Sequence, residues 1–232
     1  MKKIFLSLII SSSLLGCSSS VSTPNIDQFS QHSGGKTMGD ATTFYWYTER
    51  LNQPYTAADH VFAGDYGWYK TDYRWNEGEM RELIREGEQI RQDVGLVPYR
   101  VHVRFNVKGE AVYQQYRIDD KVLPINEEQL KRYKLEAQSV SDVTKEFSRE
   151  GFELIQGYWN GSSFETCSGE TYDEIAFNQT LPTFVVNRLS SIDSYIAVLG
   201  RTRVNKIIVE ELLMLDEDSH DCVARPALIE SN

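Results

Sequence analysis

Residues 101–110 have the sequence VHVRFNVKGE, and this stretch decides the fold class. Apolar side chains at Val101, Val103 and Phe105 alternate with polar ones. Successive side chains of a β-strand point to opposite faces, so this alternation predicts a strand with one buried and one wet face. The asparagine and glycine that follow, Asn106 and Gly109, are typical of a hairpin turn. The stretch therefore predicts a strand that turns back onto an antiparallel neighbour.

A partial repeat of this pattern occurs earlier in the chain. Residues 74–79 (RWNEGE) match residues 104–110 (RFNVKGE) with one residue fewer, and both combine an aromatic strand end with a short turn. The Tyr- and Trp-rich residues 66–75 extend the strand character. Residues 80–90 also fit helical spacing, but we expect a strand because they directly follow a turn of the repeat. We predict an antiparallel meander over residues 42–125.

A long amphipathic helix is predicted over residues 126–150. Asn126 is a suitable N-cap, and the acidic residues just after it suit the positive end of the helix dipole. Gly151 can end the helix. Apolar residues three and four apart form a stripe that would face a core. They are Leu130, Tyr133, Ala137, Val140 and Phe147.

Residues 151–232 are predicted to form a second, smaller β-rich subdomain. Asn160-Gly161 is a hairpin signal, and the last predicted strand is apolar enough to be buried on both faces. The fold class we predict is α+β: mainly an antiparallel β meander with one long amphipathic helix and this second subdomain. Its predicted elements are strands at 153–159 and 162–166, a short helix at 182–189, and strands at 195–199 and 207–215.

The N-terminal segment has the features of a secretory signal. Lys2 and Lys3 precede a short apolar run, and residues 14–17 are Leu-Leu-Gly-Cys. This ending resembles the lipobox of bacterial lipoproteins, in which the cysteine is acylated and the chain is cut before it. The resemblance implies a signal peptide at 1–16, palmitate or a related acyl chain on Cys17, and a flexible tether at 17–41. Ser18 after the cysteine implies the outer membrane, facing the periplasm. An ordinary signal with an incidental cysteine is the alternative.

Two further cysteines, Cys167 and Cys222, remain once Cys17 is assigned to the lipid. An even pair in an oxidising compartment predicts a disulfide between them. Two free, buried thiols are the alternative, although the polar neighbours of both cysteines disfavour it.

Charge and motif spacing limit the chemistry that we expect. The formal net charge is −10, which disfavours a nucleic-acid partner because phosphates need a dense basic face. The four histidines form no metal-ligand pattern, and we expect no catalytic residue, no metal and no cofactor. Acidic pairs are available for a hydrolase, but in an acidic chain they are expected as solvated surface. These pairs are Glu77/Glu79, Asp119/Asp120, Asp173/Glu174 and Glu210/Glu211.

The lipobox, the Tyr-rich strands, residues 74–79 and residues 97–101 (VPYRV) carry a wider resemblance. The chain resembles small uncharacterised γ-proteobacterial outer-membrane lipoproteins that are grouped as a domain of unknown function. This resemblance implies a periplasm-facing, membrane-anchored protein and supplies no catalytic residues. We therefore expect a non-enzymatic lipoprotein that binds an envelope protein or a cell-wall component. The alternatives are a carrier of a small apolar ligand inside the aromatic meander and, less favoured, a periplasmic hydrolase.

Overall fold

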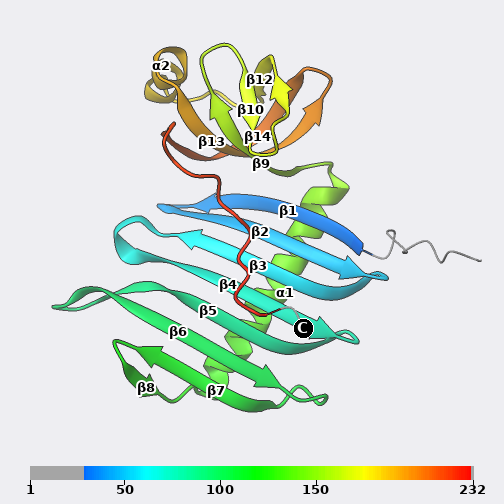
Figure 1. Ribbon diagram of the computed structural model, residues 1–232, viewed down its shortest axis with the longest axis vertical. Coiled ribbons are helices and arrows are strands. Elements are labelled where there is room, and N and C mark those ends of the chain that lie inside the picture. Colours follow the sequence, from blue (N-terminus) through cyan, green and yellow to red (C-terminus); the bar gives the residue numbers. More distant parts are fainter. Residues whose placement is uncertain (1–28, 231–232) are drawn as a thin grey trace, which may run out of the picture.

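The computed structural model describes residues 29–230, which form a mainly β protein with two sheets (Figure 1). In the first sheet each strand pairs antiparallel with the next along the chain, so the spatial order is β1 to β8. The predicted meander is thus present, and it begins earlier than residue 42. The strands are β1 (Phe29–Met38), β2 (Ala41–Arg50), β3 (Gln53–Phe62), β4 (Gly67–Asn76), β5 (Glu79–Arg91), β6 (Gly95–Phe105), β7 (Ala111–Ile118) and β8 (Lys121–Leu123), with a 3₁₀ turn η2 (Gly64–Tyr66) before β4.

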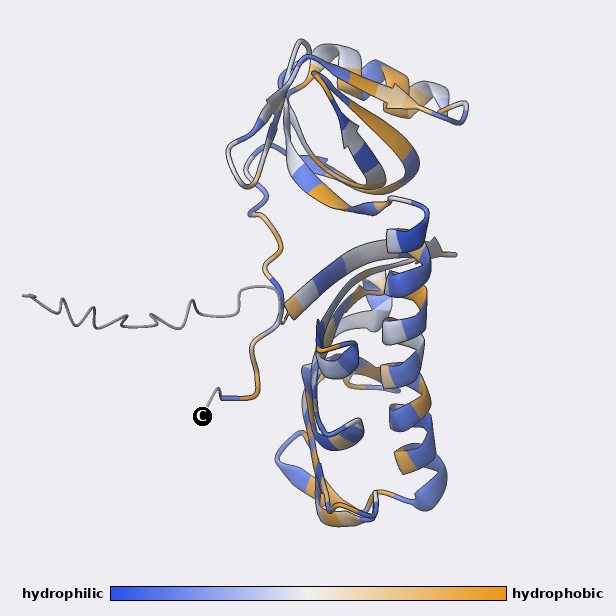
Figure 2. Cartoon of the chain, turned by 90° about the vertical axis from the view of Figure 1, so that its right-hand side faces the viewer, coloured by the Kyte–Doolittle hydropathy of each residue, from blue (hydrophilic) through white to orange (hydrophobic). Residues whose placement is uncertain are grey.

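Helix α1 (Glu127–Arg149) covers one face of this sheet (Figure 2). It begins with a capping box: the Asn126 side chain accepts from the Gln129 N–H, and the Gln129 side chain accepts from the Asn126 N–H. It ends at Arg149, and Gly151 follows with a φ of 79°, which suits glycine. Tyr133 of the predicted stripe is buried against the sheet. Several aromatic side chains of the meander pack here as core, with Tyr47 and Tyr73 fully buried.

The second sheet is strongly curved and nearly closed (Figure 2). Its order is β11-β10-β9-β13-β14-β12, with β12 parallel to β14 and the other pairs antiparallel. Its elements are β9 (Glu153–Trp159), β10 (Phe164–Thr166), β11 (Thr171–Tyr172), β12 (Glu174–Phe177), α2 (Thr183–Ser191), β13 (Ser194–Arg203) and β14 (Lys206–Glu217).

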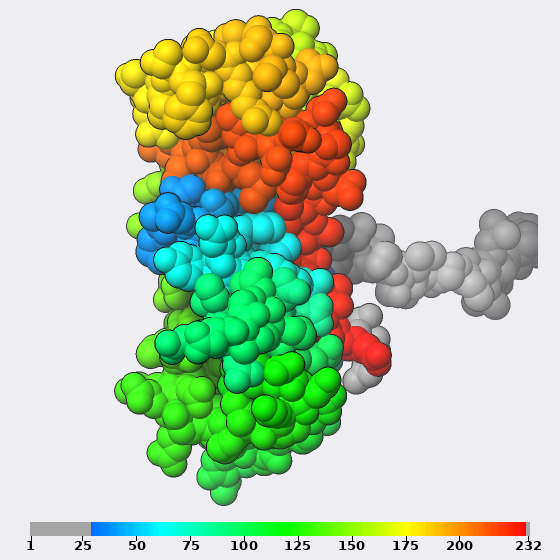
Figure 3. All heavy atoms as spheres, turned by 90° about the vertical axis from the view of Figure 1, so that its left-hand side faces the viewer, coloured from blue at the N-terminus to red at the C-terminus, as the bar shows by residue number. Residues whose placement is uncertain are grey.

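Residues 218–230, the C-terminal segment, leave the second sheet and cross the first sheet on the face opposite α1 (Figures 1, 2 and 3). Cys222 lies at disulfide distance from Cys167, with Cα atoms 6.1 Å apart. The Gln156 side chain accepts from the Val223 N–H and donates to the Val223 carbonyl. On the first sheet, Asp72 Oδ2 accepts the N–H groups of residues 228 and 229, both at 3.1 Å. The segment therefore joins the two sheets.

The predicted tether was wrong from residue 29 onward, because Phe29–Met38 form β1 and pair with β2 along their whole length. The sequence QHSGGK in this strand has no large apolar side chain to signal it. Close packing against other segments requires glycine at two positions of this strand. A Cβ at Gly34 would overlap the ring of Phe147, and one at Gly35 would lie 2.5 Å from Leu213 Cδ1. Residues 1–28, with the predicted signal peptide, Cys17 and the start of the tether, lie outside the described residues.

Two predictions about individual strands can be compared directly with the structure. Strand β5 confirms the choice of strand for residues 80–90. Burial on both faces was predicted for 207–215, but β13 has this property instead, since Ser194–Gly200 are all buried. Strand β13 lies between β9 and β14, and its two faces enter different cores. No helix within residues 29–230 has the length and apolar character needed to cross a membrane.

Candidate functional site: the cleft at the free edge of β1

Strand β1 is an edge strand whose two halves differ. The Thr37 N–H donates to Glu211 Oε1 of β14 at 2.8 Å, so this N–H points away from β2. Alternate residues of an antiparallel strand present their backbone groups to the same side. Those of Gln31 and Ser33 therefore also point to the free edge. Within residues 29–230, the structure shows no backbone hydrogen-bond partner for them there.

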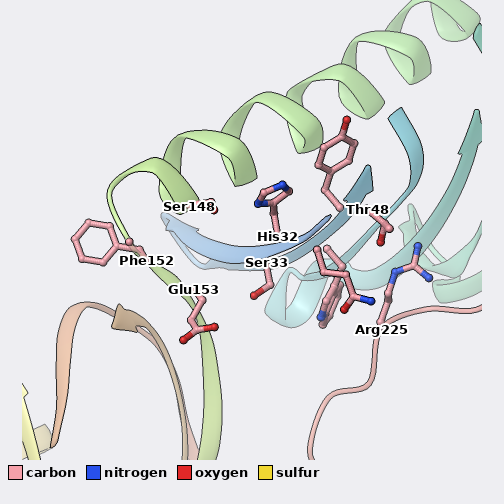
Figure 4. A pocket seen from close by; sticks show the side chains of 11 residues that line it. His32, Ser33, Thr48, Ser148, Phe152, Glu153 and Arg225 are labelled. Carbon is pink, nitrogen blue, oxygen red and sulfur yellow. The ribbon is translucent and has the colours of Figure 1, made fainter. Parts of the chain in front are cut away.

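A cavity of about 440 Å³ lies against this first half of β1 (Figure 4). Its other walls are Ser148 near the end of α1, Phe152 just before β9, Glu153 at the start of β9, and Arg225 of the C-terminal segment. Ligand sites typically occupy about 300–1,000 Å³, so the volume suits a ligand. A second cavity of about 490 Å³ shares Gln31, Thr48 and Arg225 with the first and continues under the C-terminal segment.

His32 points from β1 toward α1, whereas Ser33 points to the opposite face (Figure 4). The imidazole stacks on Tyr47, with ring centroids 5.9 Å apart. Its two nitrogens are buried and have no hydrogen-bond partner in the described part of the chain, and Nε2 lies 3.7 Å from Glu49 Oε2. Burial raises the pKa of Glu49, but the hydrogen bond and charge of Lys145 outweigh it and hold the pKa below its usual range. Glu49 is thus an anion paired with Lys145. The His32 nitrogens can still form hydrogen bonds with a ligand.

Arg225 belongs to the C-terminal segment and lies on the face of the first sheet opposite α1 (Figure 4). Its Nε and Nη2 atoms are buried without a hydrogen-bond partner in the described part of the chain, and Nη2 lies 3.7 Å from Asp72 Oδ1. Buried polar groups nearly always have partners, so an unpaired guanidinium nitrogen at a cavity indicates a place for a ligand oxygen. Glu153 lines the same cavity. Burial, with a contribution from Glu170, raises the pKa of its carboxyl.

These groups suit an extended polypeptide chain. The edge of β1 offers backbone donors and acceptors, which pair best with another backbone. The side chains of an added strand would alternate between its two faces. One set would meet His32 and the other Arg225.

The residues singled out from the sequence lie elsewhere. Cys17 is outside the described residues, and the Cys167–Cys222 pair is present as predicted. Among residues 29–230, no three or more His, Cys, Asp or Glu side chains are placed to hold a metal. The acidic pairs are spread over both sheets: Glu77 and Asp119 lie in turns, while Glu210 and Glu211 bind Asn178 and Thr37 respectively.

Gln31, His32 and Arg225 were not predicted as site residues from the sequence. The first two were assigned to the tether, and Arg225 to the part of the second subdomain that follows its last predicted strand. No signal in the sequence indicated them, because the residues on either side of Gly34-Gly35 are consecutive polar ones, which is typical of a linker.

Comparison with known proteins identifies a family. No curated protein and no solved structure matches the chain. The model of one protein family matches residues 33–227, which include all of the second sheet and nearly all of the first. Because this match covers most of the chain, the protein belongs to the family described as protein of unknown function, DUF1481.

Proposed function

We propose that the protein is a lipid-anchored, non-enzymatic binding protein of the bacterial envelope. It captures an extended segment of an envelope protein at the free edge of β1. The observation that carries this proposal is the outward backbone of Gln31, which has no partner among residues 29–230 and faces a cavity of about 440 Å³. An incoming strand would satisfy this backbone by β-augmentation.

The side-chain preference of the site follows from its two walls. Side chains of the captured strand that face Arg225 should be acidic or amide, because its Nε and Nη2 have no hydrogen-bond acceptor within residues 29–230. Those on the other face meet His32 and should carry a hydroxyl or amide group.

The proposed anchor is an acyl-modified Cys17 in the outer membrane, with the folded part in the periplasm. The resemblance of residues 14–17 to a lipobox supports it, and the Cys167–Cys222 pair suits an oxidising compartment. A net charge of −10 gains no attraction from an anionic membrane surface, so lipid has to hold the protein. Cys17→Ala should abolish acyl labelling and release the protein into the soluble periplasm; continued membrane association would contradict the anchor.

The binding proposal is tested with a photo-crosslinking residue at Thr48, which lines both cavities. In living cells it should form an adduct with an envelope protein. Gln31→Pro removes the free N–H without breaking the ladder to β2, because proline is tolerated on an outward-facing edge. It should abolish the adduct. Gln31→Ala is the matched control, because it keeps the N–H and should keep the adduct.

Two results would contradict the proposal. One is an adduct that survives Gln31→Pro at full yield. The other is an equal pattern of adducts from a crosslinker at Leu135, which is 59% exposed on α1 and remote from the cleft. Thermal unfolding of both Gln31 variants checks that the first sheet is intact.

A further inference from the structure

The sequence repeat around Arg74 and Arg104 is also a structural repeat. In each copy the strand register shifts directly after the arginine: between Arg74 and Trp75, and between Arg104 and Phe105. A β-bulge of this kind inserts one extra residue in the neighbouring strand and redirects the side chains around it. The extra residues are Arg81 in β5 and Val112 in β7.

Both extra residues line one cavity of about 400 Å³ at the end of the first sheet. Arg74 lies two residues from Asp72 on β4, so it shares the face that carries the C-terminal segment rather than the face covered by α1. The other lining residues are Glu82, Arg104, Phe105 and Tyr113.

The charges in this cavity do not balance. Glu82 is 8% exposed and pairs with Arg74. Its Oε1 accepts a hydrogen bond from His102 Nε2 at 2.8 Å and lies 3.9 Å from Arg104 Nε. Arg81 forms no ion pair within the described residues. One carboxylate therefore faces three guanidinium groups. Two positive charges are left over at one site of a chain whose net charge is −10.

We infer that this cavity binds a phosphate monoester, carried either by a lipid headgroup or by a soluble molecule. The dianion of a phosphate monoester matches the two unbalanced charges, and the planar guanidinium fork fits phosphate oxygens in pairs. The side chain of Arg104 is 61% exposed and can reach such a ligand. Tyr113 and Val112, 42% and 65% exposed, supply an apolar wall for the group that bears the phosphate.

The inference is independent of the proposed peptide site, which lies at β1. It is tested by titrating the full chain with inorganic phosphate and with glycerol 3-phosphate, followed by calorimetry. Arg81→Gln and Arg104→Gln should each weaken binding about tenfold, the loss expected for one charge-assisted contact. Arg203→Gln is the matched control, because Arg203 is exposed in β13 on the second sheet.

A second arm separates the two sources of phosphate. The chain with Cys17→Ala, which cannot be acylated there, is sedimented with phosphatidylcholine vesicles that do or do not contain phosphatidic acid. Sedimentation that depends on phosphatidic acid and on Arg81 supports a lipid headgroup; phosphate binding without it supports a soluble ligand. The inference is overturned if no saturable phosphate binding is detected, or if all three variants bind like the unmodified chain.

Discussion

Replacing Arg85 by methionine should strongly destabilise the contact between α1 and the first sheet. The Arg85 side chain is 7% exposed and lies between the two. Its Nε donates to Thr71 Oγ1 at 2.8 Å, and its Nη2 donates to Glu136 Oε2 of α1 at 2.8 Å and to the Tyr73 hydroxyl at 3.2 Å. The guanidinium also lies 4.1 Å from the ring centroid of Tyr69.

The size of the effect follows from what the substitution leaves behind. Asp59 is 4% exposed, and the Tyr73 hydroxyl donates to its Oδ2 at 2.8 Å, while its Oδ1 has no hydrogen-bond partner among residues 29–230. Removing one partner from a buried charged network costs about 3–5 kcal/mol, because the remaining charge stays buried. Arg85→Met should therefore lower the free energy of unfolding by that amount. Asp59→Asn in the same chain should restore part of it, since the uncompensated carboxylate is then gone.

The assay is urea unfolding followed by tryptophan fluorescence, with Trp75 in the same core as a reporter. Burial raises the pKa of Asp59, so the folded state binds its proton more readily, and the deficit of Arg85→Met should shrink as the pH falls. Arg132→Met is the matched control: Arg132 is 61% exposed and lies 3.7 Å from the same Glu136, so its loss should cost less than about 1 kcal/mol. Equal stability of the two variants, or no recovery with Asp59→Asn, would refute the reasoning.

Two further predictions concern the disulfide and a buried histidine. Replacing both Cys167 and Cys222 by serine opens a loop of 55 residues. On the chain-entropy model this should lower the free energy of unfolding by about 4 kcal/mol. Identical urea midpoints for the oxidised and reduced chains would contradict the prediction. Burial, with a contribution from Lys70, lowers the pKa of His60 to about 4 from 6.5, so the unfolded state binds the proton first and stability should fall between pH 6.5 and 4. His60→Gln should flatten this part of a plot of stability against pH, and an unchanged slope would count against the assignment.

Much of the fold could be predicted because its signals are local. The alternation at Val101, Val103 and Phe105 marks a strand whether or not its neighbours are known. The Asn126 cap and the apolar stripe ending near Gly151 mark α1 in the same way. The paired turns after Arg74 and Arg104 correctly placed β5 as a strand. The disulfide needed only the count of cysteines and an assumed compartment.

The candidate site could not be predicted, because its parts come from segments far apart in the sequence. Periodicity tells which face of an element is apolar, but not which strand ends a sheet or what covers its edge. Strand β1 has no apolar alternation and is held by pairing with β2 and by close packing at its two glycines. Arg225 reaches the same cavity through a segment fastened to both sheets. The sequence by itself thus determined the strands that carry apolar alternation, their turns and the long helix, because the free energy of these elements depends on near neighbours. Only the tertiary structure decided the free edge and the unpaired side chains around it, because these depend on packing between distant segments.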